Sequence, residues 1–182
     1  MRRAGILAAL TGLAGAVGFS PAGFADEAAT RREDQLKAAY LFNFVKFVEW
    51  PASVPTDVLT VCFVGGEGVH DALASGIDSK RVGPRRLAVR QVQESASATD
   101  CNVLYLDAAV VPEGRVSSQD RLPILTVSDA KGFARSGGMI EVFTDSNRLR
   151  FRINIDNAQQ AGLRISSSLL QLAASIEKAG PK

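Results

Sequence analysis

The stretch VLTVCFVGGEG, residues 58–68, indicates most clearly how this chain folds. Its first seven residues are almost all apolar or β-branched, a run typical of a strand buried on both faces of a sheet. Glycines on both sides of Glu67 then turn the chain, and residues 69–74 have the pattern of a short helix. A buried strand that leads through a turn into a helix is the repeating unit of α/β proteins with a parallel sheet.

The rest of the chain continues this alternation. We expect further strands at residues 87–92, 102–106, 124–127, 139–144 and 149–155, helices at 34–50, 128–135, 156–162 and 166–178, and a helical turn within 113–120. Residues 145–148 have hairpin character, which makes the last two strands antiparallel. The sequence therefore predicts a three-layer α/β fold. Its mostly parallel central sheet of about six strands has an antiparallel C-terminal hairpin, with helices on both faces.

The first 25 residues predict export from a bacterial cytoplasm. Arg2 and Arg3 precede an apolar run over residues 6–19, and small residues at Gly23 and Ala25 match the pattern that signal peptidase cleaves. A membrane anchor is the alternative, but the run is shorter than the roughly 20 residues that span a bilayer. We therefore expect a signal peptide over residues 1–25, cleaved after Ala25.

Residues 26–182 then form the mature chain, whose length suits a single domain. The whole sequence has 21 basic and 19 acidic residues, and the signal peptide removes two arginines, so the mature chain is formally neutral. That balance lacks the basic footprint of a nucleic-acid-binding protein. No later apolar stretch is long enough to cross a membrane.

The chain has two cysteines, Cys62 and Cys101. An even number in an oxidising compartment favours a disulfide. If the two strands that carry them are neighbours, their Cα atoms could approach the roughly 5–6 Å that a disulfide needs. A redox-active pair would usually lie closer in sequence. Two thiols and the single histidine, His70, do not complete a four-ligand zinc site.

Candidate catalytic residues have simpler interpretations. The glycines of residues 65–68 lack the spacing of a phosphate loop, and Glu67 would repel a phosphate. His70 is followed by Asp71, but consecutive residues on a helix do not face each other. The serines at 166–168 begin a predicted helix, where serine serves as a cap. The sequence thus predicts neither an enzyme nor a bound cofactor.

Arg148, Arg150 and Arg152 alternate along the predicted strand at residues 149–155 and therefore project to one face of the sheet. Three guanidinium groups together could bind an acidic partner surface. The alternative is an exposed outer face on which these arginines pair with Glu141 across the hairpin.

The predicted helix at residues 34–50 is apolar over a wide arc. Such a helix must be covered on most sides, either by its own domain or by another subunit. The simplest assembly that covers it is a two-fold dimer.

Three segments together resemble the YfiR-like family. They are QLKAAYLFNFVKFVEWP (residues 35–51), VSDAKGFA with GGMI (127–134 and 137–140), and RINID with AGLRISS (152–156 and 161–167). The resemblance extends over nearly the whole mature chain. It implies a periplasmic α/β domain without known catalysis, and it implies a homodimer. It also implies a disulfide that corresponds to Cys62–Cys101, whereas the second cysteine pair of some relatives is missing here.

The resemblance further implies a regulatory function and two partners. Relatives repress an inner-membrane diguanylate cyclase by binding its periplasmic sensor region, which lowers cyclic di-GMP and biofilm formation. An outer-membrane, peptidoglycan-associated lipoprotein sequesters the repressor. The alternative function is a periplasmic small-ligand sensor acting through another membrane partner. Its site would be a crevice at the carboxyl ends of the parallel strands.

Overall fold

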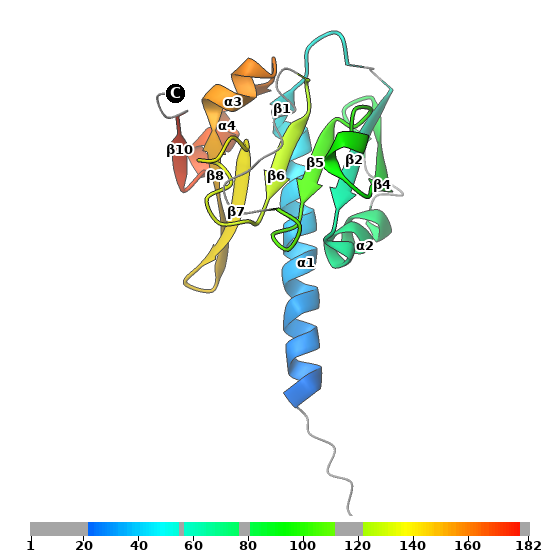
Figure 1. Ribbon diagram of the computed structural model, residues 1–182, viewed down its shortest axis with the longest axis vertical. Helices are drawn as coiled ribbons and strands as arrows, with labels where there is room; N and C mark the ends of the chain where they lie inside the picture. Colours follow the sequence, from blue (N-terminus) through cyan, green and yellow to red (C-terminus); the bar gives the residue numbers. More distant parts are fainter. Residues whose placement is uncertain (1–21, 55–56, 77–80, 112–121, 179–182) are drawn as a thin grey trace, which may run out of the picture.

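Eight strands form the central sheet of the protein. The computed structural model describes residues 22–54, 57–76, 81–111 and 122–178 (Figure 1). The elements are α1 (Ala22–Phe47), β1 (Val48–Glu49), β2 (Val58–Val64), α2 (Glu67–Ser75), β3 (Arg81–Val82), β4 (Arg85–Gln91), the 3₁₀ turn η1 (Ser95–Ser97), β5 (Val103–Leu106), β6 (Leu125–Ser128), β7 (Ile140–Asp145), β8 (Arg148–Asn154), α3 (Ile155–Gln160), β9 (Arg164–Ile165), α4 (Ser167–Leu172) and β10 (Ser175–Glu177).

The predicted α/β class, with a mostly parallel central sheet and an antiparallel C-terminal hairpin, is confirmed. The prediction of three layers with helices on both faces was wrong for the described residues: the buried residues of all four α-helices belong to one cluster on one face, and the segment at 128–135 that was expected to be helical forms turns on the other.

The strands lie in the order β10-β8-β7-β6-β5-β2-β4-β3, and the pairs from β4 through β7 are parallel. The hairpin of β7 and β8 is antiparallel, and its turn residues Ser146 and Asn147 have positive φ, as a tight hairpin turn requires. All six predicted strands are present. The sheet is two strands wider than expected, because the short strands β3 and β10 extend its edges.

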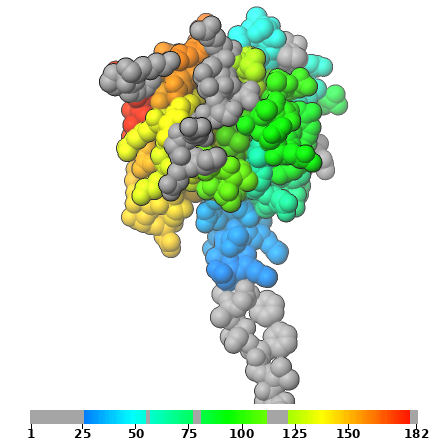
Figure 2. All heavy atoms as spheres, viewed as in Figure 1, coloured from blue at the N-terminus to red at the C-terminus, as the bar shows by residue number. Residues whose placement is uncertain are grey.

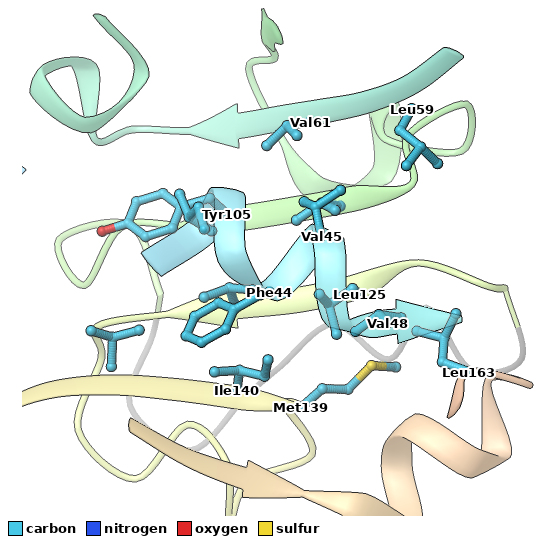
Figure 3. Packing of buried hydrophobic residues seen from close by; sticks show 14 of the residues in the cluster. Phe44, Val45, Val48, Leu59, Val61, Tyr105, Leu125, Met139, Ile140 and Leu163 are labelled. Atoms are coloured by element: carbon cyan, nitrogen blue, oxygen red, sulfur yellow. The ribbon is translucent and has the colours of Figure 1, made fainter. Parts of the chain in front are cut away.

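Helix α1 packs along one face of the sheet, where the larger apolar core forms (Figure 1). Phe44 and Val45 of α1 are fully buried against inward-facing residues of the strands, among them Val61, Leu125 and Ile140 (Figure 3). Buried residues of α2, α3 and α4 belong to the same cluster. Successive side chains of a strand point to opposite faces of the sheet, so alternate residues of each strand enter this core.

The first helix was predicted to run to Trp50, but it ends at Phe47. The next two residues, Val48 and Glu49, pair with β9 as a separate two-stranded sheet. The backbone N–H of Ser166 also donates to the carbonyl of Phe47 at 3.0 Å. Tertiary hydrogen bonds therefore end the helix three residues before its predicted end.

The helix predicted for residues 128–135 is absent: Ser128 ends β6, and residues 131–137 are turns. Gly132 has a φ of 81°, which a right-handed helix does not allow. The Oγ of Ser128 still accepts a hydrogen bond from the N–H of Ala130 at 3.0 Å, so it stabilises a local turn instead of a helix.

The last predicted helix, residues 166–178, is replaced by a helix and a strand. Ser166 caps α4 by accepting the N–H of Leu169, as its position predicted. The helix then ends at Leu172, and β10 pairs in parallel with the open edge of β8. Without β10, the backbone N–H and C=O groups along the outer edge of β8 would have no strand to pair with.

A second, smaller cluster lies on the opposite face of the sheet. It contains Leu104, Leu106 and Phe133 around a disulfide between Cys62 and Cys101. The disulfide predicted from the cysteine count is confirmed, with the two Cα atoms 5.9 Å apart. It links β2 to the start of the neighbouring strand β5.

Some predictions concern residues that the structure does not describe. The predicted turn at 113–120 falls outside the described residues, as do residues 1–21 of the predicted signal peptide. The predicted cleavage position after Ala25 lies in the first turns of α1. Among the helices of the described part, none is both long and apolar enough to span a membrane.

Candidate functional site

Two surfaces could carry function, and the first is the arginine face predicted from the sequence. Leu149, Phe151 and Ile153 point into the larger core, so the arginines at alternate positions of β8 point to the opposite face. The three arginines are therefore on one side of the sheet, as expected from the period of a strand. Their environments differ.

Arg152 belongs to a buried ion pair. Its guanidinium lies 2.6 Å from Oε1 of Glu141, whose side chain is 1% exposed, and 3.9 Å from the centre of the Phe143 ring. The other carboxylate oxygen of Glu141 accepts the backbone N–H of Ala134. A buried carboxylate needs such a partner, because an unpaired buried charge is strongly destabilising. Arg152 therefore makes the cross-hairpin pairing with Glu141 that was the alternative interpretation.

The other two arginines are closer to solvent. Arg150 pairs with Asp145 at 3.0 Å, and both side chains are about half exposed. Arg148, at the start of β8, is exposed. A groove of about 520 Å³ lies beside Arg150 and Arg152 and extends to Ser175 of β10. We call this surface the arginine groove.

The second surface lies at the carboxyl ends of β2, β5 and β6. After β2 the chain forms β4 on one side of β2, and it then crosses back to form β5 on the other side. The direction of winding therefore changes at β2. Open α/β sheets bind ligands beside such a switch point. At this position Gly65 and Gly66 have positive φ, and a side chain on Gly66 would collide with the Tyr105 ring. The glycines therefore let the turn approach the end of β5 closely.

A cluster of charged side chains surrounds this switch point. Asp129 directly follows β6. Its Oδ1 accepts a hydrogen bond from the backbone N–H of Ala108, and its Oδ2 lies 2.7 Å from Nζ of Lys37. Lys37 also lies 3.0 Å from Glu33. Burial alone would lower the pKa of Lys37, but its hydrogen bonds to Asp129 and Glu33 outweigh burial and raise it. The ammonium of Lys37 therefore stays charged and links α1 to the end of the sheet.

Tyr105 lies beneath this cluster. The residue is fully buried. Burial, the negative charges of Asp129 and Asp107, and the interaction of the hydroxyl with the Asp129 carboxylate all raise the pKa of the hydroxyl. Burial also raises the pKa of Asp34, although Lys37 opposes that shift. We call Asp34, Tyr105, Asp107 and Asp129 the carboxylate cluster.

A crevice at this edge was expected from the sequence, but none of these four residues was expected to line it. Asp107 and Asp129 carry a readable signal, because each follows directly on a buried strand and strand ends meet at one edge. Asp34 comes from α1 and has no such signal. Only the packing of α1 against the sheet brings it here.

The remaining candidates from the sequence do not join either surface. Nδ1 of His70 lies 2.8 Å from Oδ1 of Asp71, so the expectation that these neighbours do not meet was wrong. The pair lies at the surface of α2, where the Asp71 side chain is 81% exposed. In the described part of the chain, no group of three or more His, Cys, Asp or Glu side chains is arranged to hold a metal ion.

Comparison with known proteins identifies relatives of this fold. A family model described as YfiR/HmsC-like matches residues 34–174. Among solved structures, the chain is similar to a crystal structure of a conserved domain protein from Vibrio cholerae O1 biovar El Tor strain N16961, with a TM-score of 0.53 and 14% identity. That similarity covers 79% of this chain and 60% of the Vibrio chain, and at this identity it concerns the fold alone.

Proposed function

Because the chain belongs to the YfiR/HmsC-like family, we propose that it is a periplasmic regulatory binding protein that represses an inner-membrane diguanylate cyclase. The family match over residues 34–174 is the observation that carries this proposal, since it covers most of the described fold. The family is a regulatory one. The protein would act by binding and not as an enzyme, and it would lower cyclic di-GMP.

Several features of the chain support a periplasmic location. The predicted signal peptide over residues 1–25 would direct export, and residues 26–182 would form the single mature domain. The Cys62–Cys101 disulfide suits an oxidising compartment. The proposed partners are the periplasmic sensor region of the cyclase and an outer-membrane, peptidoglycan-associated lipoprotein that would sequester the repressor.

The arginine groove is the proposed partner surface. Arg148 and Arg150 are exposed enough to meet acidic side chains of a partner. Arg152 already neutralises Glu141, so it would contribute mainly by holding the groove in shape. Reversing all three charges is therefore not a clean test, because a glutamate at position 152 would face Glu141. Reversing Arg148 and Arg150 alone tests the surface without disturbing the buried pair.

A homodimer is also part of the proposal. Phe42 and Phe47 of α1 are only partly buried within the chain, and Lys46 lies over both rings at 5.7 and 6.0 Å. Leu36, on the same helix, is 46% exposed. Light scattering of the exported protein should give the mass of two chains. A single-chain mass at micromolar concentration would contradict the dimer.

A gene deletion tests the regulatory function. A repressor acts by binding one state of its target more tightly than another. Deletion should therefore raise cyclic di-GMP, and the exported protein should reverse the rise, whereas a copy without residues 1–25 should not. The variant Arg148→Glu/Arg150→Glu should fold normally and fail to repress. Unchanged cyclic di-GMP in the deletion strain would refute the repressor function.

The alternative, a small-ligand sensor that acts through another membrane partner, is favoured by one observation, the carboxylate cluster at the switch point of the sheet. Thermal shifts of the purified protein with a metabolite panel would support the sensor. Co-purification of a membrane cyclase would support the repressor.

A further inference from the structure

Three arginines lie at the end of the sheet opposite the arginine groove. Arg86 and Arg90 belong to β4, and Arg81 belongs to β3, the last strand on that side. Leu87 and Val89 of β4 pack into the larger core, so Arg86 and Arg90 project from the other face, which also carries the arginine groove. Arg81 is paired with Arg86 in the strand register and therefore shares this face. We call Arg81, Arg86 and Arg90 the arginine row.

The arginine row and the arginine groove differ in how their charges are balanced. In the groove, Arg150 pairs with Asp145 and Arg152 pairs with Glu141. Within the described residues, no member of the arginine row forms an ion pair, although all three are exposed. Residues 81–91 contain no acidic residue either. The described part of the chain therefore leaves the positive charge of the row uncompensated.

The arrangement of the row points to an anion from outside the chain. Arg81 and Arg86 lie directly opposite each other on neighbouring strands, where like charges are destabilising. A carboxylate bound between the two guanidinium groups would remove that repulsion. The guanidinium of Arg90 lies 3.4 Å from Sγ of Cys101 and 3.7 Å from Sγ of Cys62. Sulfur is a weak acceptor, so this guanidinium can still donate to a stronger one.

The sheet surface beside the row is accessible. Val58 and Thr60 of β2 are paired with Arg86 and Ala88 in the strand register, and Val58, Thr60 and Ala88 are partly buried. In the described part of the chain, no α-helix contributes a buried residue to the cluster on this face. Figure 1 shows α1 behind the sheet, and Figure 2 shows the same side, with the segment from β4 to η1, in green, at the surface on the right. The row therefore borders small, partly apolar side chains that another molecule can reach.

Charge and side-chain size together indicate the class of partner. A guanidinium matches the paired oxygens of a carboxylate or of a phosphate. Proteins that bind a lipid surface use large apolar side chains as well as charge. None of the exposed large apolar residues in the described part of the chain lies on β2, β3 or β4. The row therefore fits the carboxylates of an acidic protein better than the phosphates of a membrane.

We propose that the arginine row binds an acidic segment of a partner protein. One carboxylate of the partner would lie between Arg81 and Arg86, and a second would reach Arg90. Arg86 and Arg90 are about 13 Å apart along their strand, so acidic residues four positions apart in an extended segment would match them. The proposal goes beyond the regulatory function, because it assigns a second interaction surface at the other end of the sheet from the arginine groove.

Binding of fluorescently labelled poly-L-glutamate to the exported protein, measured by anisotropy, tests the proposal. The wild type should bind it. Arg81→Gln/Arg86→Gln should weaken binding about tenfold, as expected for the loss of two charged contacts. Arg31 and Arg32 are exposed in the first turns of α1, so Arg31→Gln/Arg32→Gln removes the same charge elsewhere. This control should weaken binding less than about twofold, because charges far from the contact are screened.

Urea unfolding gives a second, independent test. Arg81→Gln should unfold at a higher urea concentration than the wild type, because it removes the repulsion from Arg86, and high salt should reduce the difference. A residue that stabilises the fold would shift unfolding in the opposite direction.

Several results would overturn the proposal. They are the absence of poly-L-glutamate binding, equal weakening by the two double variants, and unfolding of Arg81→Gln at a lower urea concentration than the wild type. Vesicles of phosphatidylglycerol should not bind through the row. Vesicle binding that Arg81→Gln/Arg86→Gln abolishes would assign the row to a membrane surface instead. None of these outcomes bears on cyclic di-GMP in the deletion strain.

Discussion

The two faces of the sheet are stabilised by different means. Helices cover one face and bury a large, almost wholly apolar cluster. The other face has a small cluster to which, within the described residues, no α-helix contributes, and there a disulfide and the buried Glu141–Arg152 pair lie between turns. A core of apolar side chains tolerates substitutions that keep the total volume and the apolar pattern. The second face depends on particular pairs, and it presents the arginine groove.

The largest effect is expected on the helix-covered face. Phe44 is 1% exposed and contacts Phe151 with ring centres 5.0 Å apart. Phe44→Ala should lower the free energy of unfolding by about 3–5 kcal/mol, because it leaves a cavity. Urea unfolding measures the change. Phe42→Ala on the same helix, at a partly buried position, should cost clearly less, and equal losses would contradict this description of the core.

The disulfide should matter nearly as much for the opposite face. Cys62 and Cys101 are 39 residues apart in sequence, and closing a loop of that length is worth about 4 kcal/mol on the chain-entropy relation. Cys62→Ser/Cys101→Ser should lose about 2–5 kcal/mol of unfolding free energy. Chemical reduction of the wild type should bring it to the same stability. Free thiols in non-reducing mass spectrometry of the native protein would refute the bridge.

A somewhat smaller loss is expected from breaking the buried ion pair. Arg152→Ala should cost about 3 kcal/mol in unfolding free energy, since it leaves the Glu141 carboxylate buried without a cation. Adding Glu141→Gln to that variant should recover part of the loss. Arg148→Ala, on the same face but exposed, should cost less than about 0.5 kcal/mol. If Arg148→Ala were as costly as Arg152→Ala, the contrast between buried and exposed arginines would be wrong.

The smallest effect concerns pH at the edge between the two faces. Burial raises the pKa of Asp34 in the folded chain, so the folded state holds this proton more tightly than the unfolded state. Stability from this group is therefore greatest at low pH and falls as pH rises through its raised pKa. Asp34→Asn should be more stable than wild type at pH 7, by under about 0.5 kcal/mol after solvent screening, and equal to it at pH 3. A loss of stability at pH 7 would reverse the assigned sign.

Strands and the fold class were predictable because they depend on local patterns. The run at residues 58–64 is apolar on both faces, and such a run has few alternatives to a central buried strand. The hairpin likewise follows from residues 145–148, whose turn conformation is local. The alternation along β8 also predicted correctly that its arginines share a face.

Helix ends and the candidate sites depended on contacts between distant parts of the chain. Residues 175–177 form a strand because the edge of β8 is free to pair with them. The hairpin places Glu141 opposite Arg152, so this pair could be predicted from the sequence. Its burial could not, because it depends on the contacts with Ala134 and Phe143 in the folded chain.

By itself, the sequence determined the six longer strands of the sheet, the cysteine pair and the family resemblance, because these depend on residue type and spacing. Only the tertiary structure decided the carboxylate cluster. Asp34 and Lys37 come from α1, Asp107 and Asp129 from two strand ends, and the strand order brings them together around Tyr105. The physical reason is that charge interactions depend on distance in space, which residues far apart in sequence acquire only when the sheet and α1 pack.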